Sequence, residues 1–109
     1  MPTAYVTVPR TAAEDLVEVV LTERLAACVN RIPCESTYRW EGSVETDEEA
    51  ILLCKTTEDA YDKLVDRIRA VHPHDVPCIE RFDEADVDDP YREWIAESVD
   101  ATGTGNSNP

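Results

Sequence analysis

Residues 26–56 read AACVNRIPCESTYRWEGSVETDEEAILLCKT, and this stretch decides the fold. Both halves are rich in residues that favour β-strands, apart from Pro33 in the first half, and the second half contains the apolar run 50–54. Glu41 and Gly42 lie between the halves. Glycine at the second position of a tight turn adopts a positive φ without steric cost, so the stretch predicts a β-hairpin that turns at these two residues.

A two-residue turn fixes which residues of the two strands face each other. It sets Tyr38 opposite Glu45 near the turn and Cys28 opposite Lys55 at the far end. A bulge at Pro33 would instead shift the inner register by one residue, because proline cannot donate a hydrogen bond to the neighbouring strand. The sequence leaves both registers open.

The predicted hairpin is too long for a domain of this size. Each arm has about fourteen residues and at ~3.3 Å per residue spans on the order of 45 Å, whereas a compact domain of about 100 residues has a radius of gyration of only ~13 Å. The distal half must therefore leave its own domain and carry Tyr38 and Trp40 with it. An exposed ribbon of this kind aggregates unless another copy pairs with it, so we expect an obligate homo-oligomer with closed cyclic symmetry.

Two further strands and three helices flank the hairpin. Apolar residues at alternating or helical spacing place them at strand 5–8, helix 11–24, helix 56–71, strand 77–82 and helix 88–99. Thr11 and Glu14 have the spacing of a capping box at the start of the first helix, and Asp88 is the expected cap of the last helix, two residues before Pro90. The second helix is expected to end before the His-Pro pair at 72–73.

The order of elements is β-α-β-β-α-β followed by a helix. This is the split βαβ order of ferredoxin-like folds, so we expect an α+β sandwich. A chain of 109 residues has room for one hydrophobic core. We therefore expect a single domain over residues 1–100 and a disordered tail over residues 101–109, because the Gly, Ser and Asn residues of the tail are too polar to pack.

Acidic residues outnumber basic residues throughout the chain. Twenty-four Asp and Glu against ten Lys and Arg give a net charge of −14, which repels phosphate backbones and argues against nucleic acid as a partner. No run of residues is apolar enough for a membrane helix, so we expect a cytoplasmic protein without a membrane partner. Dispersed acids are typical of halophilic proteins, whose self-repulsion is screened by salt, but a generic cation-attracting surface has the same composition.

Four segments together resemble the CutA divalent-cation tolerance family: residues 23–30 (ERLAACVN), 38–45 (YRWEGSVE), 55–57 (KTT) and 72–77 (HPHDVP). Their order and spacing match the family from about residue 5 to residue 99. The resemblance implies a homotrimer of ferredoxin-like subunits whose long strands pair between neighbours. It also implies a role in the tolerance of copper and other divalent cations, and no enzymatic reaction is established for the family.

His72, His74, Asp75 and Cys78 supply nitrogen, oxygen and sulfur donors that suit copper or another divalent metal ion such as zinc. His74 and Cys78 depart from the family, which commonly has a tyrosine and an acid there, and Val6 stands where some members carry a cysteine proposed to bind copper. The alternative is structural: His72 could order the loop before the last strand, and Cys78 could pack as a small hydrophobic residue.

Cys28 is the fourth candidate metal ligand. It follows two alanines in segment 23–30, where small residues also favour close packing against a helix. A copper(I) site shared between subunits would need thiolates from several chains. The four cysteines have no Cys-x-x-Cys spacing, so neither a zinc ribbon nor a redox dithiol is predicted.

Lys55, Trp40, Tyr91 and Trp94 are candidates for a ligand cleft at a subunit junction. Lys55 follows an apolar run, so its ammonium group either faces a cleft or extends from the strand end toward water. The aromatic residues could line such a cleft, but aromatic residues at helical spacing also form cores and interfaces.

Two functions are consistent with these candidates. The first is a trimeric cytoplasmic protein that binds copper or other divalent ions for metal homeostasis. The second is a scaffold like the nitrogen-regulatory PII proteins, which binds a small effector in inter-subunit clefts through Lys55 and Trp40. No Ser elbow and no Cys paired with a His at a recognisable spacing is present, so we expect neither an enzyme nor an organic cofactor.

Overall fold

The computed structural model describes residues 1–100, and the expected disordered tail over residues 101–109 lies outside the described residues. Eight elements succeed one another along the chain: β1 (Pro2–Pro9), the short 3₁₀ helix η1 (Arg10–Ala12), α1 (Ala13–Thr22), β2 (Cys28–Trp40), β3 (Ser43–Lys55), α2 (Tyr61–Val71), β4 (Cys78–Asp83) and α3 (Asp89–Ser98). The predicted β-α-β-β-α-β order with a terminal helix is confirmed.

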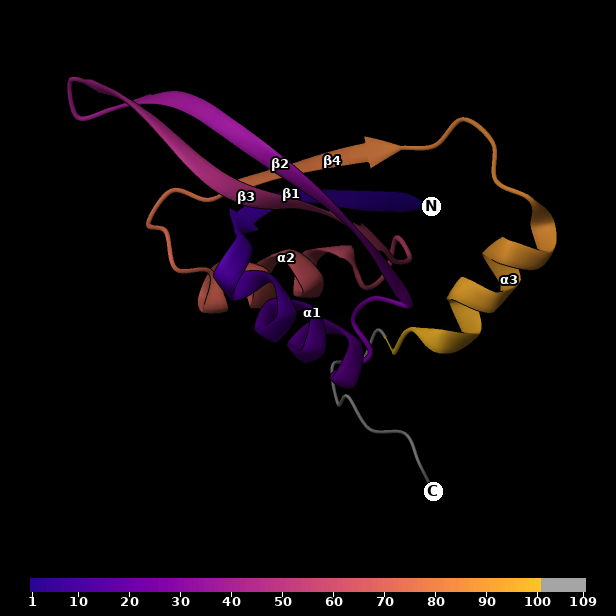
Figure 1. Ribbon diagram of the computed structural model, residues 1–109. Helices are drawn as coiled ribbons and strands as arrows, with labels where there is room; N and C mark the ends of the chain where they lie inside the picture. Colours follow the sequence, from indigo (N-terminus) through magenta and orange to yellow (C-terminus); the bar gives the residue numbers. More distant parts are fainter. Residues whose placement is uncertain (101–109) are drawn as a thin grey trace.

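The four strands form one antiparallel sheet in the order β2-β3-β1-β4. Helices α1 and α2 pack side by side on one face of the sheet, as Figure 1 shows, and α3 lies beyond one end of it. We call the face that α1 and α2 leave uncovered the open face. This arrangement is the ferredoxin-like α+β sandwich that the sequence predicts. Within residues 1–100, no helix is long and apolar enough to cross a membrane.

The hydrophobic core lies between the sheet and the two helices. Alternate residues of the strands point into it, and the apolar stripes of α1 and α2 close it from the other side. Its fully buried members include Val6, Leu52, Leu64 and Ile68. Full burial of a side chain of this size stabilises a fold by about 1.5–3 kcal/mol. The core therefore fixes the proximal parts of the strands to the helices.

The hairpin turns where the sequence predicts. Glu41 and Gly42 both have positive φ, 49° and 84°, and the register sets Tyr38 opposite Glu45 and Cys28 opposite Lys55. The bulge considered at Pro33 does not form, because this residue pairs directly with its partner on β3. A sheet-edge position tolerates proline, since the missing N–H then faces away from the neighbouring strand.

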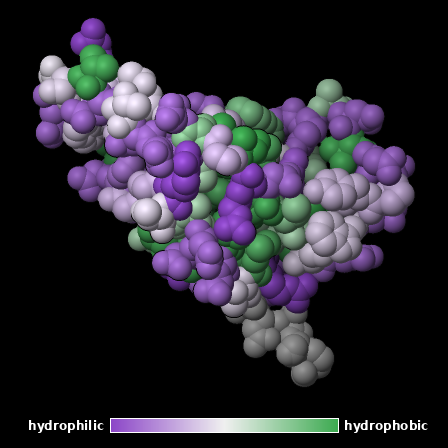
Figure 2. Space-filling view, viewed as in Figure 1, coloured by the Kyte–Doolittle hydropathy of each residue, from purple (hydrophilic) through white to green (hydrophobic). Residues whose placement is uncertain are grey.

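The distal half of the hairpin, residues 35–48, projects from the body of the molecule. Figure 1 shows it as a twisted two-stranded ribbon extending past the ends of β1 and β4, and Figure 2 shows a narrow arm. The molecule measures 49 × 30 × 20 Å as a consequence. Every residue from 41 to 48 is exposed, whereas Glu49 and Ala50 are buried. Within the described residues, the hairpin therefore leaves the core close to residue 49.

Arg10 marks the point where the hairpin leaves the core. Its guanidinium group donates to a carboxylate oxygen of Glu48 at 3.1 Å, to the carbonyl of Cys34 at 3.1 Å and to the carbonyl of Glu49 at 3.4 Å. One side chain from η1 thus contacts both arms of the hairpin.

Two expected helix starts are wrong, and the third, at residues 88–89, is confirmed without its expected side-chain cap. Thr11 lies inside η1, so α1 begins at Ala13 without a side-chain cap and the capping box with Glu14 does not form. The second helix begins at Tyr61, because residues 58–60 form a turn in which the hydroxyl of Thr57 accepts from an amide at 3.3 Å. Asp88 makes no side-chain cap on α3. At the first two starts, a tight turn takes the place of the predicted first helical turn.

A buried side chain and an arginine help to attach helix α3 to the body of the molecule. Ile95 is its buried residue among the described part of the chain, whereas Tyr91 and Trp94 are 37% and 46% exposed. Arg24, in a left-handed conformation with φ 59°, donates to the carbonyl oxygens of residues 97 and 98 at 3.1 and 3.2 Å. A cation at the last carbonyls of a helix also interacts favourably with the helix dipole.

Candidate functional site

The predicted site residues lie at two opposite ends of the molecule. One set surrounds a hollow of about 330 Å³ between the hairpin tip and the α2–β4 loop, which we call the distal pocket; it is lined by Tyr38, Trp40, Pro73, His74, Asp75 and Val76. The other set surrounds a hollow of about 390 Å³ on the open face, which we call the basal groove; it is lined by residues of all four strands and by Glu84.

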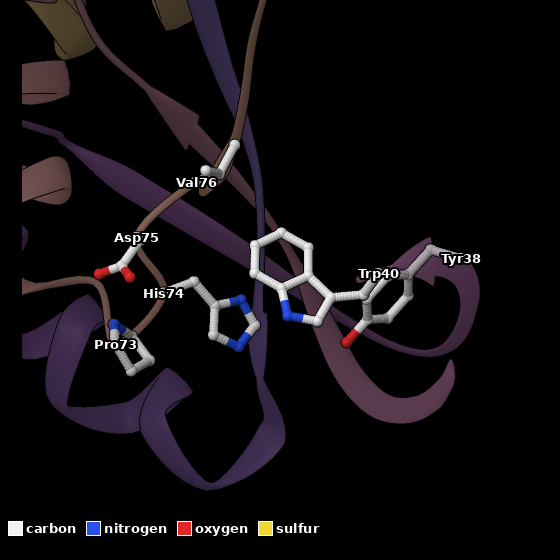
Figure 3. Close-up of a pocket in the computed structure, with 6 residues that line it drawn as sticks. All are labelled: Tyr38, Trp40, Pro73, His74, Asp75 and Val76. Carbon is white, nitrogen blue, oxygen red and sulfur yellow. The ribbon is translucent and has the colours of Figure 1, made fainter. Parts of the chain in front are cut away.

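In the distal pocket, His74 and Trp40 come from different parts of the chain and point toward each other (Figure 3). The imidazole of His74 makes no hydrogen bond with any described residue, and its only ring contact is with His72, at 5.2 Å between centroids. Tyr38 donates its hydroxyl to Asp47, and this hydrogen bond raises the pKa of Tyr38 to about 12. Among the described residues, the pocket therefore contains an imidazole without a hydrogen-bond partner, that of His74, next to the aromatic rings of Tyr38 and Trp40.

His72 has a structural role in the loop. It is 8% exposed, its Nε2 lies 2.8 Å from the carbonyl oxygen of Thr7, and its Nδ1 accepts from the backbone N–H of His74 at 3.0 Å. Because Nδ1 accepts, Nε2 carries the proton that is donated to Thr7. Both ring nitrogens are thus engaged, and a metal ion would have to displace one of these hydrogen bonds. This geometry fits the structural interpretation of His72, in which its side chain orders the loop before β4.

The cysteines do not come together within one chain. Cys28 lies opposite Lys55 at the basal end of the sheet, whereas Cys78 pairs with Thr7 on the other edge, and both are half-buried and free. Cys54 is buried on the helix side, and burial raises the pKa of its thiol to about 12. Within residues 1–100, no three His, Cys, Asp or Glu side chains are close enough to hold a metal ion. The four predicted donors therefore do not form one site in a single subunit.

One row of residues crosses the open face at the basal end of the sheet. In this row Lys55 on β3 pairs with Thr3 on β1, and Thr3 pairs on its other side with Phe82 on β4. The hydroxyl of Thr3 donates to Oε2 of Glu84, which comes directly after β4. The second oxygen of this carboxylate, Oε1, is buried and has no hydrogen-bond partner in the described part of the chain. The Lys55 side chain likewise has no hydrogen bond or ion pair there.

Apolar side chains form the walls of the basal groove. They are Tyr5, Ile32, Ile51, Leu53 and Phe82. The rings of Tyr5 and Phe82 stack with centroids 5.2 Å apart. The groove is thus apolar along its length and carries two opposite charges at one end.

Tyr91 on α3 lies beside the charged end of the groove. Burial raises its pKa, and the neighbouring Cys28 raises it further, with a smaller effect of Glu84. Its ring stacks on that of Trp94 at 5.9 Å between centroids. Lys55 and Tyr91 therefore lie beside Cys28 at this end, with Trp94 stacked on Tyr91, whereas Trp40 lies in the distal pocket. Sequence reasoning missed Glu84, which lies among several acids and has no local signal.

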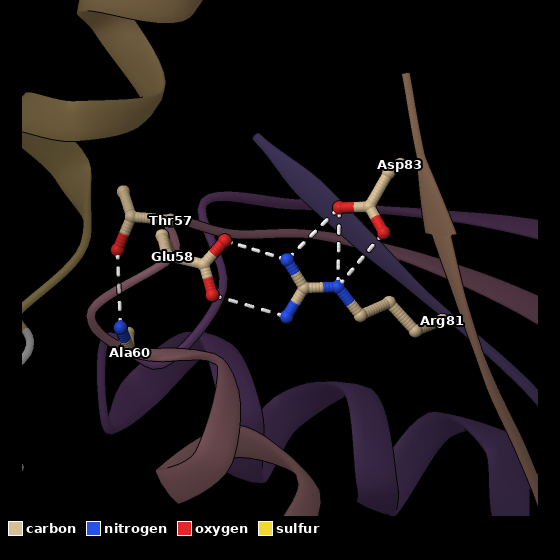
Figure 4. Close-up of polar contacts among 5 residues, drawn as sticks. All are labelled: Thr57, Glu58, Ala60, Arg81 and Asp83. Carbon is tan, nitrogen blue, oxygen red and sulfur yellow. Dashed lines mark hydrogen bonds and ion pairs between the residues drawn. The ribbon is translucent and has the colours of Figure 1, made fainter. Parts of the chain in front are cut away.

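Arg81 forms a separate polar cluster on the helix side of β4 (Figure 4). It donates to both carboxylate oxygens of Glu58, at 2.5 and 3.1 Å, and to Asp83 at 2.9–3.1 Å, and its guanidinium group lies 4.7 Å from the centroid of the Tyr61 ring. These bonds lower the pKa of both carboxyl groups. The cluster connects β4 to the turn before α2. Its three charged groups pair with one another, so its role is structural.

The sequence is similar to that of a known protein family. The family model described as "CutA1 divalent ion tolerance protein" matches residues 3–98. The chain belongs to this family. The "Divalent-cation tolerance protein CutA" of Thermus thermophilus is 46% identical over 93 residues, which cover 84% of this chain and 86% of the relative.

Solved CutA structures have the same fold. The crystal structure of CutA1 from Pyrococcus horikoshii superimposes with a TM-score of 0.87 at 40% identity, covering 92% of this chain and 99% of that one. The structure described as the periplasmic divalent cation tolerance protein CutA of Archaeoglobus fulgidus gives 0.86 at 31% identity, covering 92% and 100%. The chain therefore has the fold of solved CutA structures over more than nine-tenths of its length.

Proposed function

We propose that this CutA protein is a homotrimer that binds copper or other divalent cations and contributes to metal homeostasis in the cytoplasm. The match of residues 3–98 to the divalent ion tolerance family carries this proposal. The net charge of −14 supports it, because a negative surface raises the local concentration of cations.

The distal half of the hairpin supports assembly. It exposes Trp40 by 47% and Val44 by 64%, and Val76 in the facing loop is 72% exposed. Residues this large and apolar at the end of a projecting ribbon mark an interaction surface. Strands β2 and β4 are also the two free edges of the sheet, where another chain can pair. Three-fold symmetry closes such head-to-tail contacts, and the CutA resemblance implies the same number of subunits.

Metal binding requires donors from more than one subunit. His74 and Asp75 face the distal pocket, and Cys28 and Cys78 lie on the open face, so each chain presents separate donors. Imidazole and thiolate suit copper and zinc. In a trimer, equivalent donors of neighbouring chains can approach one another. Each chain then contributes only some of the ligands of a metal site.

Calorimetry with Cu²⁺ and Zn²⁺ on the assembled protein tests the metal proposal. We expect His74→Ala, or Cys28→Ala with Cys78→Ala, to weaken binding at least tenfold. His72→Ala is unsuitable as a test, because it also removes the two hydrogen bonds that order the loop. The control is Glu18→Gln, which removes one exposed acid of α1 far from these donors. Equal affinity in all variants would leave only nonspecific attraction to the acidic surface and contradict the proposal.

A halophilic origin is part of the same proposal, since salt screens repulsion among the surface acids. We expect the midpoint of thermal unfolding to rise between low and molar KCl. Equal stability in both solutions would contradict salt adaptation without affecting the metal proposal.

A second candidate function is binding of a small effector, as in the PII proteins. One observation favours it: Lys55 lies without a polar partner among described residues at the end of an apolar groove. A native mass spectrum of untreated protein tests it, because a retained organic molecule adds its mass to that of the assembly. A spectrum that contains only protein and metal would count against this candidate.

A further inference from the structure

Glu49 is a buried acid without a partner at the point where the hairpin leaves the core. It is 5% exposed, and among the described residues its carboxylate makes no hydrogen bond and no ion pair, since Arg10 contacts only its backbone carbonyl. Its oxygens keep some accessible surface, because the one enclosed and unpartnered carboxylate oxygen of residues 1–100 belongs to Glu84. A buried charge is costly unless it is paired or coordinates a metal. Glu49 therefore needs a cationic partner from outside the described chain.

Cys34 lies directly opposite Glu49 and shares its face of the sheet. The two residues form a cross-strand pair between β2 and β3, and both side chains lie on the open face, because Ala50, the next residue of β3, points into the core. The thiol of Cys34 is half-buried and free, with a weak contact to the hydroxyl of Ser36 at 3.9 Å. A thiol and a carboxylate side by side supply two donors for a late divalent ion such as Zn²⁺.

Cys78 is a third donor on the same face, at the opposite edge of the sheet. It pairs with Thr7 on β1, and its thiol is half-buried and free. Burial raises the pKa of Tyr5, and the charges of Cys78, Cys34 and Glu49 are among those that raise it further, so all three groups lie within electrostatic range of one hydroxyl. Strands β3 and β1 nevertheless separate the two cysteines, and within residues 1–100 the donors do not form a metal site.

The two free edges of the sheet bring these donors together when two chains pair. Strand β2 runs parallel to β1 and β4 runs antiparallel to it, so β2 of one chain joins β4 of the next in the antiparallel manner, with both open faces on the same side. Cys78 lies in the same row as Ile32, and a stagger of two residues toward the hairpin turn, where β2 lacks a partner among the described residues, sets it opposite Cys34. Directly opposed Cβ atoms are ~4.5–5.5 Å apart, within reach of one metal ion.

We propose that Cys34 and Glu49 of one chain, together with Cys78 of the partner subunit, form a site for Zn²⁺ or a similar late divalent ion at each junction between subunits. Two thiolates and a carboxylate leave one position of a tetrahedral ion for water. Binding releases one proton from each thiol, and the ion offsets the charge of the buried carboxylate. This inference rests on the proposed metal-binding function and names its donors, two of which the sequence did not single out.

Calorimetry with Zn²⁺ on the assembled protein tests the donors. We expect Cys34→Ser, Cys78→Ser and Glu49→Gln each to weaken binding at least tenfold. The controls are Ser36→Ala, which changes the neighbour of Cys34 but no donor, and Glu18→Gln, which removes an exposed acid of α1. Both controls are expected to bind as the unchanged protein does.

Mixed trimers show whether the donors come from two chains. When Cys34→Ser and Cys78→Ser chains are refolded together, a junction between the two kinds of chain has either both cysteines or neither. We expect Zn²⁺ binding to return in the mixture although each variant alone has lost it. Native mass spectrometry with one variant isotope-labelled verifies the mixing. Mixed trimers without recovered binding would place the donors in one chain and overturn the proposal.

Co²⁺ absorption tests the unchanged protein, so the result does not depend on variants that fail to assemble. Thiolate ligands give bound Co²⁺ an intense charge-transfer band in the near ultraviolet, and we expect this band in the assembled protein. Bound Co²⁺ without the band overturns the proposal. If Zn²⁺ binding is lost in His74→Ala or Cys28→Ser but unchanged in Cys34→Ser, metal binding stands while this inference fails, and equal affinity in all variants contradicts both.

Discussion

The proximal and distal parts of the β2–β3 hairpin have the same backbone pairing but opposite surroundings. On β3, Ala50, Leu52 and Cys54 are 0–5% exposed beneath α1 and α2. From residue 41 to residue 48, every residue is exposed although its strand pairing is intact. Hydrogen bonds between two strands alone do not make a stable hairpin in water. The distal part therefore depends on contacts that its own chain does not supply.

The largest expected effect is in the proximal part. Leu52→Ala removes a fully buried side chain and leaves a cavity, so we expect a loss of about 2–5 kcal/mol in the free energy of unfolding. Urea denaturation measures it. The matched distal variant, Val44→Ala, removes a side chain that is 64% exposed in the single chain, so it leaves no cavity in the core, and we expect a smaller loss that depends on protein concentration because it acts through subunit association. Equal losses at the two positions would contradict the distinction.

The distal part should matter for assembly instead. Trp40 is 47% exposed in the single chain, and buried tryptophans at interfaces commonly contribute about 2–4 kcal/mol. We expect Trp40→Ala to weaken subunit association by this amount, seen by analytical ultracentrifugation as dissociation at lower protein concentration. Leu21→Ala on α1, which removes an exposed apolar side chain on the opposite side of the sheet, is the control. An unchanged association constant for Trp40→Ala would place the interface elsewhere.

Thiol reactivity distinguishes the two parts chemically. Burial raises the pKa of Cys54 to about 12, so at pH 8 only about one molecule in 10⁴ carries the thiolate that reacts. We expect iodoacetamide to leave Cys54 unmodified in the folded protein while it modifies Cys34, which is half-buried and lies near the start of the distal half. Peptide mass spectrometry after labelling measures both. Rapid labelling of Cys54 would show that the proximal core opens.

The smallest expected effect is at the boundary between the two parts. Arg10 contacts Glu48 and two backbone carbonyls there, but its side chain and that of Glu48 are 45% and 70% exposed. Exposed ion pairs contribute only about 0–1 kcal/mol, so Arg10→Met should hardly change the free energy of unfolding. Hydrogen exchange should nevertheless quicken in residues 35–48, because the bond to the Cys34 carbonyl holds this arm. Unchanged exchange there would show that Arg10 does not hold the hairpin.

The fold was largely predictable because its decisive signals are local. The turn at Glu41 and Gly42 fixes the hairpin and its register, and alternating apolar residues place the strands. The sequence places the first two helix starts too early, at Thr11 and Thr56, because a capping pattern competes with a tight turn of similar hydrogen bonding. Strand β1 was predicted too short, since its extension to Pro2 depends on pairing with two strands far away in the sequence.

The candidate sites were predictable only in part. Lys55 and Tyr91 were selected by residue type and do lie near Cys28. The sequence could not show that His74 and Cys28 belong to opposite ends of the molecule, because that separation results from the direction of the strands. Glu84 carries no local pattern, and its buried oxygen depends on the pairing of β1 with β4. The pairing of strands that are far apart in the sequence therefore decides which residues meet in each site.

The central claim is that the distal half of the hairpin is completed by other copies of the chain. A native mass measurement at micromolar protein concentration tests it most directly. We predict a single species of three times the 12.2 kDa chain mass, with slow hydrogen exchange along residues 35–48. A stable species of 12.2 kDa in which the same residues exchange slowly would contradict the claim.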